Sequence, residues 1–205
     1  MHSSFEKIIF LDIGGVLLSN GWGHKQRMAA AEALGFDYAE MNKLHDLCFS
    51  VYELGRITLD QYLDIVLFYK EQPFSREEMK ECMFRQSAEL PDLLPWLIDF
   101  KQKHPGRFRF ISINNEGKEI NRQRILRFGL HRLFDAYVSS GEVGLLKPDP
   151  AIFTLALGIA GATPDQCIYF DDRAILAEAA TRQGITGYQH TDFNKTKKIF
   201  EELAR

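Results

Sequence analysis

The feature that most limits how this chain can fold is the stretch from Ile8 to Leu18, IIFLDIGGVLL. Four consecutive apolar residues end at Asp12, and this pattern predicts a short buried strand with one carboxylate at its end. Burying an ionised carboxylate is costly unless a metal ion or hydrogen-bond donors contact it. Gly14 and Gly15 let the backbone turn sharply beside it. Asp12 is therefore either an ordinary turn residue or a functional group in a cleft. Residues elsewhere in the chain distinguish these two interpretations.

Composition narrows the possible functions. The chain of 205 residues is long enough for one large domain or for a core domain with a small insertion. Its net charge of -3 argues against a nucleic-acid partner, and the apolar run near the N-terminus meets Asp12 too soon for a signal or a membrane span. Three widely spaced cysteines fit buried thiols in a reducing compartment. We therefore expect a cytoplasmic protein with no membrane partner.

Residues 19–90 read as a block of about four short helices. Gly35 and Gly55 stand where helices would end, after segments at 24–34 and 38–54. Thr58 and Ser75 each begin a sequence with the spacing of a capping box, which predicts two further helix starts. The block contains no segment with the alternation of a strand. It is a candidate for a small all-helical domain inserted after the first strand.

After Pro91 the chain alternates between helices and strands. Strands are predicted at 107–113, 136–139, 167–170 and 185–189, and helices at 93–103, 118–128, 150–159, 174–183 and from about 194. This alternation is typical of a doubly wound α/β fold, in which a parallel sheet carries helices on both faces. We therefore predict an α/β core domain formed by 1–18 and 91–205, with 19–90 as a helical cap.

Polar residues follow several of the predicted strands. Because ligands of such sheets bind at the carboxyl ends of the strands, we expect these residues to share one edge. Each also has an ordinary interpretation, as a turn, a solvated loop charge or a helix N-cap, but their joint placement makes coincidence improbable. The residues are Asp12, Asn114, Asn115, Lys147, Asp171 and Asp172.

In this order the residues resemble the haloacid dehalogenase-like (HAD) hydrolase superfamily over the whole chain. Its first motif, Asp-x-Asp-x-Thr/Val, is similar to the segment from Asp12 to Val16, and its second, a Ser or Thr at a strand end, corresponds to Asn114. Its third motif is a lysine, here Lys147, and its fourth an acidic pair, here 171–172. The helical block looks like the C1-type cap of subfamily I, which covers the site and selects the substrate.

The resemblance implies a Mg²⁺-dependent hydrolase of a small phosphorylated metabolite, such as a sugar phosphate. Asp12 would attack phosphorus and form an aspartyl-phosphate that water then hydrolyses. Lys147 would neutralise negative charge, and Asn114 would donate to the phosphoryl oxygens. The metal ligands would be Asp12, Asp172 and the carbonyl of Gly14, with Asp171 in the same metal site or orienting it. Further substrate contacts are expected from Gly14, Gly15, Asn115, Ser112 and His24.

Three residues depart from the family pattern. Gly14 replaces the second aspartate, which in the family protonates the leaving oxygen, so the proton would have to come from the cap or the substrate would need a good leaving group. Asn114 replaces Ser or Thr, and Leu176 stands where many relatives have a polar residue near the metal. Variants with glycine at the first of these positions include similar active phosphatases.

The cap residues are harder to interpret from sequence. Two groups of cap residues could face the cleft, one that closely follows the Asp12 strand and one that flanks Gly55. Each could instead belong to the apolar core or to the surface of the cap. The groups are Trp22, His24 and Arg27, and Tyr52, Glu53 and Arg56. Of these, His24 is the residue we expect to replace the missing acid.

Three functions remain open. The first is the Mg²⁺-dependent phosphatase. The second is a metal-independent dehalogenase-like enzyme, against which the acidic pair 171–172 argues, because displacement at a carbon-halogen bond has no use for a metal. The third is a catalytically silent phosphate-binding or regulatory protein, which would account for Gly14, Asn114 and Leu176. The sequence does not indicate an oligomeric state.

Overall fold

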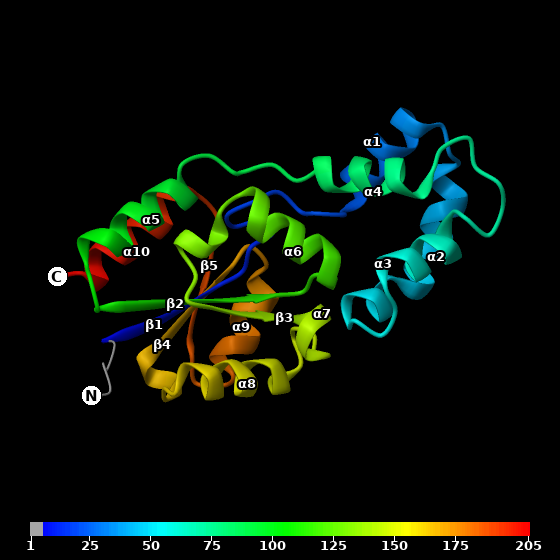
Figure 1. The fold of residues 1–205 in the computed structure, drawn as a ribbon. Helices are drawn as coiled ribbons and strands as arrows, with labels where there is room; N and C mark the ends of the chain where they lie inside the picture. The colour runs from blue at the N-terminus through cyan, green and yellow to red at the C-terminus, as the bar shows by residue number, and fades with distance from the viewer. Residues whose placement is uncertain (1–5) are drawn as a thin grey trace.

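A five-stranded parallel sheet forms the centre of the molecule (Figure 1). The computed structural model describes residues 6–205. The strands lie in the order β3-β2-β1-β4-β5, and all neighbouring pairs are parallel. Their bounds are β1 (Lys7–Leu11), β2 (Phe108–Asn114), β3 (Ala136–Ser139), β4 (Cys167–Asp171) and β5 (Thr186–Gln189). The predicted doubly wound α/β fold is confirmed.

Helices cover both faces of the sheet (Figure 1). One face carries α5 (Leu93–Lys103), α6 (Lys118–Arg127) and α10 (Phe193–Leu203), and the other carries α8 (Pro150–Ala160) and α9 (Ala174–Thr181). Successive residues of β1 alternate between the two apolar cores, Ile9 and Leu11 in one, Ile8 and Phe10 in the other. Since both faces of β1 are buried, the first polar side chain along it is Asp12 at its end.

The segment after β1 folds into the four predicted helices, which are α1 (His24–Leu34), α2 (Tyr38–Glu53), α3 (Leu59–Val66) and α4 (Arg76–Arg85). Thr58 and Ser75 both form the predicted capping boxes. Gly35 ends α1 in the left-handed conformation, with φ 77°. The helix α2 ends one residue earlier than predicted, at Glu53, and Gly55 follows with φ 67°.

Three short elements were not predicted. They are η1 (Leu130–Arg132), α7 (Ser140–Val143) and η2 (Pro164–Gln166). Each has only three or four residues, too few for a periodic pattern to identify. Most other boundaries differ from the prediction by one or two residues, which is the ordinary uncertainty of helix and strand ends.

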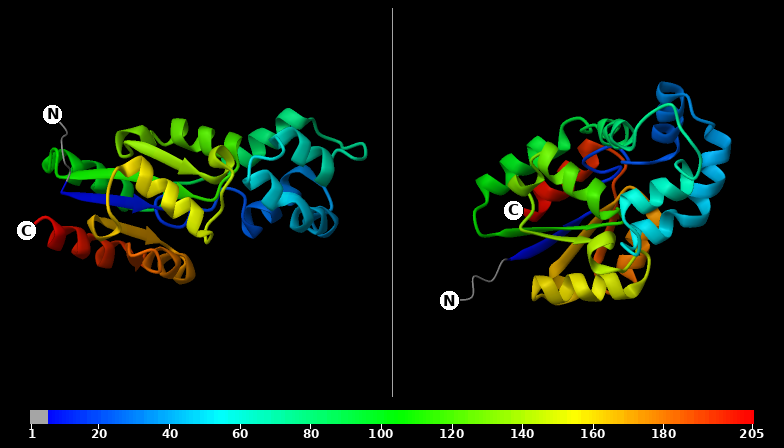
Figure 2. Two further views of the ribbon diagram at one scale, coloured as in Figure 1. Left: turned by 90° about the horizontal axis from the view of Figure 1, so that it is seen from below. Right: turned by 45° about the vertical axis from the view of Figure 1, so that its right-hand side comes forward.

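The four helices form a cap with an apolar core of its own, placed beyond the carboxyl ends of the strands (Figures 1 and 2). At its centre the Tyr62 hydroxyl accepts a hydrogen bond from Trp22 Nε1 (3.0 Å) and lies 2.8 Å from His45 Nδ1. Burial, with the charge of Arg27, lowers the pKa of His45 to about 4, so this ring is neutral at pH 7. A buried polar network thus joins the segment before α1 to α2 and α3.

The chain enters and leaves the cap at one place. Leu18 forms an antiparallel bridge with Glu89. Backbone hydrogen bonds run from Ser19 N to Ala88 O (2.8 Å) and from Leu90 N to Leu17 O (2.9 Å). The two connecting segments therefore lie side by side.

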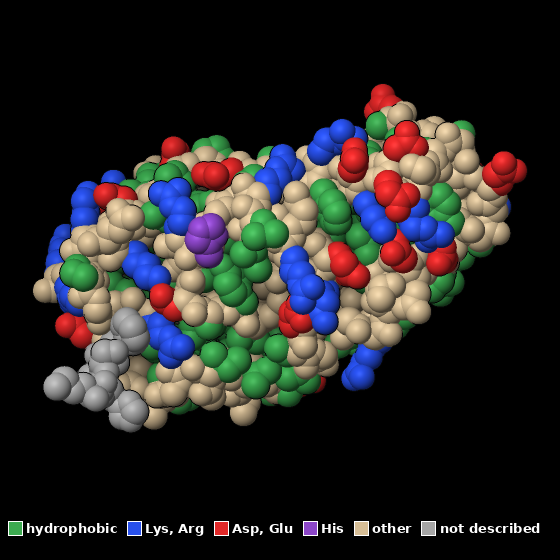
Figure 3. Space-filling view, viewed as in Figure 1, with side chains coloured by type: hydrophobic (Ala, Val, Ile, Leu, Met, Phe, Trp, Pro, Cys, Tyr) green, Lys and Arg blue, Asp and Glu red, His purple; other side chains and the backbone are tan. Residues whose placement is uncertain are grey.

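Basic and acidic side chains are interspersed on the face seen in Figure 3, in line with the small net charge. Ion pairs also join separate segments of the chain, as between Lys101 Nζ and Asp135 Oδ1 (2.6 Å). Among residues 6–205 we find no helix with the length and apolar character needed to cross a bilayer.

The polar network of the cap leads to a first prediction. Tyr62→Phe removes the hydroxyl that contacts Trp22 and His45 and leaves two buried nitrogens without this partner, so the free energy of unfolding should fall by about 1–3 kcal/mol. Urea denaturation followed by circular dichroism measures this change. Tyr69→Phe is the matched control, because Tyr69 is exposed on the cap and its loss should change stability by less than about 0.5 kcal/mol. Equal stability of both variants would contradict the prediction.

Candidate active site

Asp12 lies at the middle of the carboxyl edge of the sheet. It directly follows β1, the central strand, and its backbone N–H donates to Phe170 O of β4 (2.9 Å). Its carboxylate Oδ1 accepts a hydrogen bond from Ile13 N (2.8 Å), and the residue is only 8% exposed. The other carboxylate oxygen remains available on the floor of a cavity that Asp12 lines.

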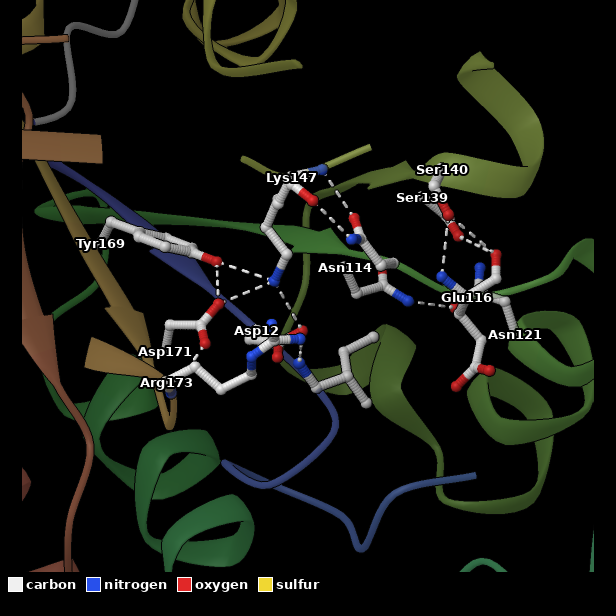
Figure 4. Close-up of polar contacts among 12 residues, drawn as sticks. Asp12, Asn114, Glu116, Asn121, Ser139, Ser140, Lys147, Tyr169, Asp171 and Arg173 are labelled. Carbon is white, nitrogen blue, oxygen red and sulfur yellow. Dashed lines mark hydrogen bonds and ion pairs between the residues drawn. The ribbon is translucent and has the colours of Figure 1, made fainter. Parts of the chain in front are cut away.

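Lys147 places a buried cation between two carboxylates (Figure 4). Its Nζ lies 3.2 Å from Asp12 Oδ1 and 2.8 Å from Asp171 Oδ2. It also donates to the Tyr169 hydroxyl (2.8 Å), which in turn donates to Asp171 Oδ2. The lysine is 4% exposed and Asp171 is fully buried, so these charges interact with little screening by water. The predicted convergence of these three segments is what the structure shows.

Asn115 holds the backbone of Lys147. Its Nδ2 donates to Lys147 O (2.9 Å), and its Oδ1 accepts from Lys147 N (2.8 Å). This two-point contact fixes the loop that precedes α8, where Asp149 and Pro150 begin the helix as expected from sequence. Asn115, which is predicted to contact substrate, therefore holds the backbone of Lys147 in place. It also borders the cavity.

Asn114 and Ser112 differ in their access to the cavity. Asn114 lines it, and its Nδ2 donates to Asn121 Oδ1 (3.1 Å), which leaves a second amide N–H for another partner. Ser112 is completely buried within β2 and does not belong to the cavity lining. The predicted contact of Ser112 with substrate therefore does not fit the structure, because the side chain is fully buried and does not reach the cavity.

The two residues of the acidic pair, Asp171 and Asp172, lie in different environments. Asp171 is fully buried and makes three contacts, because Oδ1 accepts from Arg173 N (2.9 Å) while Oδ2 contacts Lys147 and Tyr169. Asp172 is half-buried and lies against Gly15, where a Cβ would stand 2.3 Å from its Oδ2. Gly15, with φ 75°, thus makes room for a carboxylate rather than for substrate.

These carboxylates suit a hard divalent cation. One oxygen from each of Asp12, Asp171 and Asp172 lies within 4.8 Å of the others. Burial raises the pKa of Asp12 to about 6, with Lys147 opposing and Asp171 adding to the shift. Burial and Asp171 also raise the pKa of Asp172. Three carboxylates with one ammonium group leave a negative excess that a cation would balance, so the residues present fit a Mg²⁺ ion.

The cavity above Asp12 has a volume of about 240 Å³ and is lined by residues of both the core and the cap. Of the six cap residues considered from sequence, Trp22, Arg27 and Glu53 line it. His24 does not. Its Nδ1 contacts the Tyr38 hydroxyl on the cap surface, and the expectation that it replaces the missing acid is not supported by this position.

Five further lining residues were missed from sequence: Asn20, Phe49, Glu116, Arg124 and Arg173. Glu116 and Arg173 directly follow the predicted motif residues, and this adjacency could have indicated them. Glu116 and Arg124 form a buried ion pair, and Arg124 also donates to Ser19 O (2.6 Å). The Arg173 guanidinium makes no hydrogen bond or ion pair to any residue in the part of the chain that the structure describes.

The parallel α/β core, the helical cap and the carboxylate-lysine cluster at the strand ends define a hydrolase-type site. A family model of haloacid dehalogenase-like hydrolases matches residues 6–184, and the chain belongs to this family. A HAD family enzyme of Bacteroides thetaiotaomicron, solved with magnesium and inorganic phosphate, is similar in fold, with a TM-score of 0.77 and 20% identity over 90% of this chain and 94% of that one. A predicted HAD-like hydrolase of Porphyromonas gingivalis has a TM-score of 0.75 and 19% identity, covering 98% of this chain and 100% of that one.

Similarity to characterised sequences is confined to part of the chain. A glyceraldehyde 3-phosphate phosphatase of Methanopyrus kandleri is 29% identical over 83 residues, which are 40% of this chain and 34% of the relative. A phosphoserine phosphatase of Thermus thermophilus is 30% identical over 101 residues, 49% of this chain and 40% of the relative. The chain thus spans well under half the length of these relatives.

The contact between Gly15 and Asp172 leads to a second prediction. Gly15→Ala places a Cβ where the Asp172 carboxylate lies, so Asp172 must move and Mg²⁺ affinity should fall by about 10–100-fold. Isothermal titration calorimetry with Mg²⁺ measures this loss. Gly35→Ala is the matched control, since Gly35 has nearly the same φ of 77° but open space around it, and so carries the backbone strain without the clash. If both variants bind Mg²⁺ alike, Asp172 is not a ligand.

Proposed function

We propose that the protein is a Mg²⁺-dependent hydrolase of a small phosphomonoester, working through an aspartyl-phosphate on Asp12. One observation carries this proposal. The buried Asp12 carboxylate lies 3.2 Å from the Lys147 ammonium group, beside the acidic pair and in the lining of a cavity. A nucleophile, a cation and metal ligands are thereby assembled at the same place.

The residues can divide the reaction between them. The free oxygen of Asp12 forms a bond to phosphorus while the bond from phosphorus to the ester oxygen breaks, and the leaving oxygen takes up a proton. Water then attacks phosphorus, which releases inorganic phosphate and regenerates the carboxylate. Lys147 offsets the negative charge of Asp12 and of the phosphoryl oxygens, and the free N–H of Asn114 can donate to one of them. The unpaired guanidinium of Arg173, at the cavity wall, is placed to contact the same dianion.

In this proposal Asp12, Asp172 and the carbonyl of Gly14 would hold Mg²⁺, and Asp171 would orient Lys147 and Asp172 rather than bind metal. When bound, the ion shields the phosphate from the carboxylate that attacks it and stabilises the charge that develops on the phosphoryl oxygens.

The similar proteins support the proposed phosphatase function. The named sequences are phosphatases, and the similar structure from Bacteroides thetaiotaomicron holds magnesium and inorganic phosphate. We also assign the chain to subfamily I with a C1-type cap at 19–90, because four helices with their own core are inserted between the first motif and the rest of the core. A small phosphorylated metabolite in the cytoplasm is the partner that this assignment implies.

A silent phosphate-binding protein is the second candidate. It is favoured by Gly14, which provides no acid, and by the buried Leu176, which puts an apolar wall beside the metal site. The dehalogenase reading is weaker, because the structure holds Asp12, Asp171 and Asp172 close enough to share a metal ion.

Phosphate release separates the candidates. We expect turnover of p-nitrophenyl phosphate and of some members of a panel of sugar phosphates and nucleotides with Mg²⁺, loss of turnover with EDTA, and a fall in kcat of at least about 10³-fold in Asp12→Asn. Circular dichroism checks that the variant remains folded. Phosphate binding without turnover would favour the silent protein, and chloride release from 2-chloroacids without metal would favour the dehalogenase.

A further inference from the structure

We propose that Glu53 of the cap is the catalytic acid that protonates the leaving oxygen, so that the protein hydrolyses phosphate esters of ordinary aliphatic alcohols. The inference rests on the phosphatase function proposed above and adds the residue that this function lacks. Gly14 has no side chain with which to donate a proton, and an aliphatic alkoxide is a poor leaving group unless it is protonated as it departs.

The position of Glu53 suits this role. In phosphoryl transfer the attacking and leaving oxygens lie roughly in line with phosphorus, so a leaving oxygen points away from Asp12. Asp12 lies at the end of β1 on the core side of the cavity, and Glu53 lines the same cavity from the cap, as the last residue of α2. The leaving oxygen therefore departs toward the wall that carries Glu53.

The residues on both sides of Glu53 are packed tightly against the core. The ring of Tyr52 lies against Gly117, where a Cβ would stand 2.1 Å from it. Gly55 lies against Gly141, where a Cβ would stand 2.1 Å from the carbonyl oxygen. Because both neighbours touch core backbone, residue 53 is held at the junction of cap and core rather than on a freely moving surface.

Contacts further along the cap reinforce this placement. Tyr52 is buried and stacks on Tyr62, with 5.4 Å between the ring centroids. The first residue of α3 is tied to α6, since Leu59 N donates to Glu119 Oε1 (3.0 Å). The segment that presents Glu53 is thus fixed to the cap core on one side and to the core domain on the other.

The other titratable residues of the cavity already have partners. Asp12 and Lys147 form the nucleophile pair, and Asp172 belongs to the metal site. Glu116 is paired with Arg124. The arginines of the lining stay protonated at any working pH and cannot serve as acids. Of the described lining residues, Glu53 remains as the one free to give up a proton.

The surrounding charges keep a proton on Glu53 at neutral pH. Burial is the largest cause and Glu116 the next, while Arg173 and Lys147 act in the opposite direction, and together they raise the pKa of Glu53 to about 8. A dianionic phosphate in the cavity would raise it further. The other charged groups at this junction, Arg56, Lys118 and Glu142, line a separate cavity, and Glu142 is paired there with Lys118 (3.1 Å).

Leaving-group dependence tests the role directly. Glu53→Gln keeps the size of the side chain but cannot donate the proton. For the aliphatic ester of the panel that the wild type hydrolyses fastest, kcat should fall by about 10²–10⁴-fold. For p-nitrophenyl phosphate, whose leaving group departs without a proton, kcat should change by less than about threefold. Glu81→Gln is the matched control, because Glu81 is exposed on α4, and both rates should stay unchanged.

The pH profile is a second readout. With the aliphatic ester, wild-type kcat/KM should fall as the pH rises through about 8, because the acid of the free enzyme loses its proton, and this decrease should be absent in Glu53→Gln. The decrease in rate at alkaline pH should be small with p-nitrophenyl phosphate.

Several results would overturn the inference while the phosphatase function stands: equal losses on both esters, a rise in KM alone, an unaffected aliphatic rate, or a wild type that cleaves only aryl esters. A wild type that releases phosphate from no ester would instead overturn the phosphatase function, and the role of Glu53 with it.

Discussion

The ammonium group of Lys147, buried between Asp12 and Asp171, is the interaction on which the site depends. Two carboxylates this close would repel each other strongly in a dry interior if no cation lay between them. The lysine comes from the loop before α8, and the carboxylates follow β1 and end β4. Meeting this electrostatic requirement therefore fixes the relative positions of three distant segments, and the cavity forms where they meet.

Much of this arrangement could be predicted because the rules that govern it are local. An apolar run that stops at Asp12 indicates a buried strand, and parallel strands bring their carboxyl ends to one edge. Capping residues such as Thr58 and Ser75 mark helix starts within a residue. The fold, the order of its elements and the meeting of Asp12, Lys147 and Asp171 follow from such signals.

The cap side of the site could not be predicted in the same way. Successive residues on a helix point about 100° apart, so which of them face the cavity depends on how the helices pack on one another. His24 and Arg27 lie on the same helix, yet one turns to Tyr38 and the other to the cavity. Glu53 is oriented by contacts of its neighbours with Gly117 and Gly141, residues more than sixty positions away. Asn115, likewise, forms two hydrogen bonds with the backbone of Lys147, which its residue type does not reveal.

The two segments that connect the cap to the sheet are paired at Leu18 and Glu89. Since the chain departs from the sheet and returns to it at adjacent points, the helices between can be lengthened, shortened or exchanged without straining the strands on either side. Both covalent connections between the helical cap and the sheet thus run through this one pair of hydrogen-bonded segments.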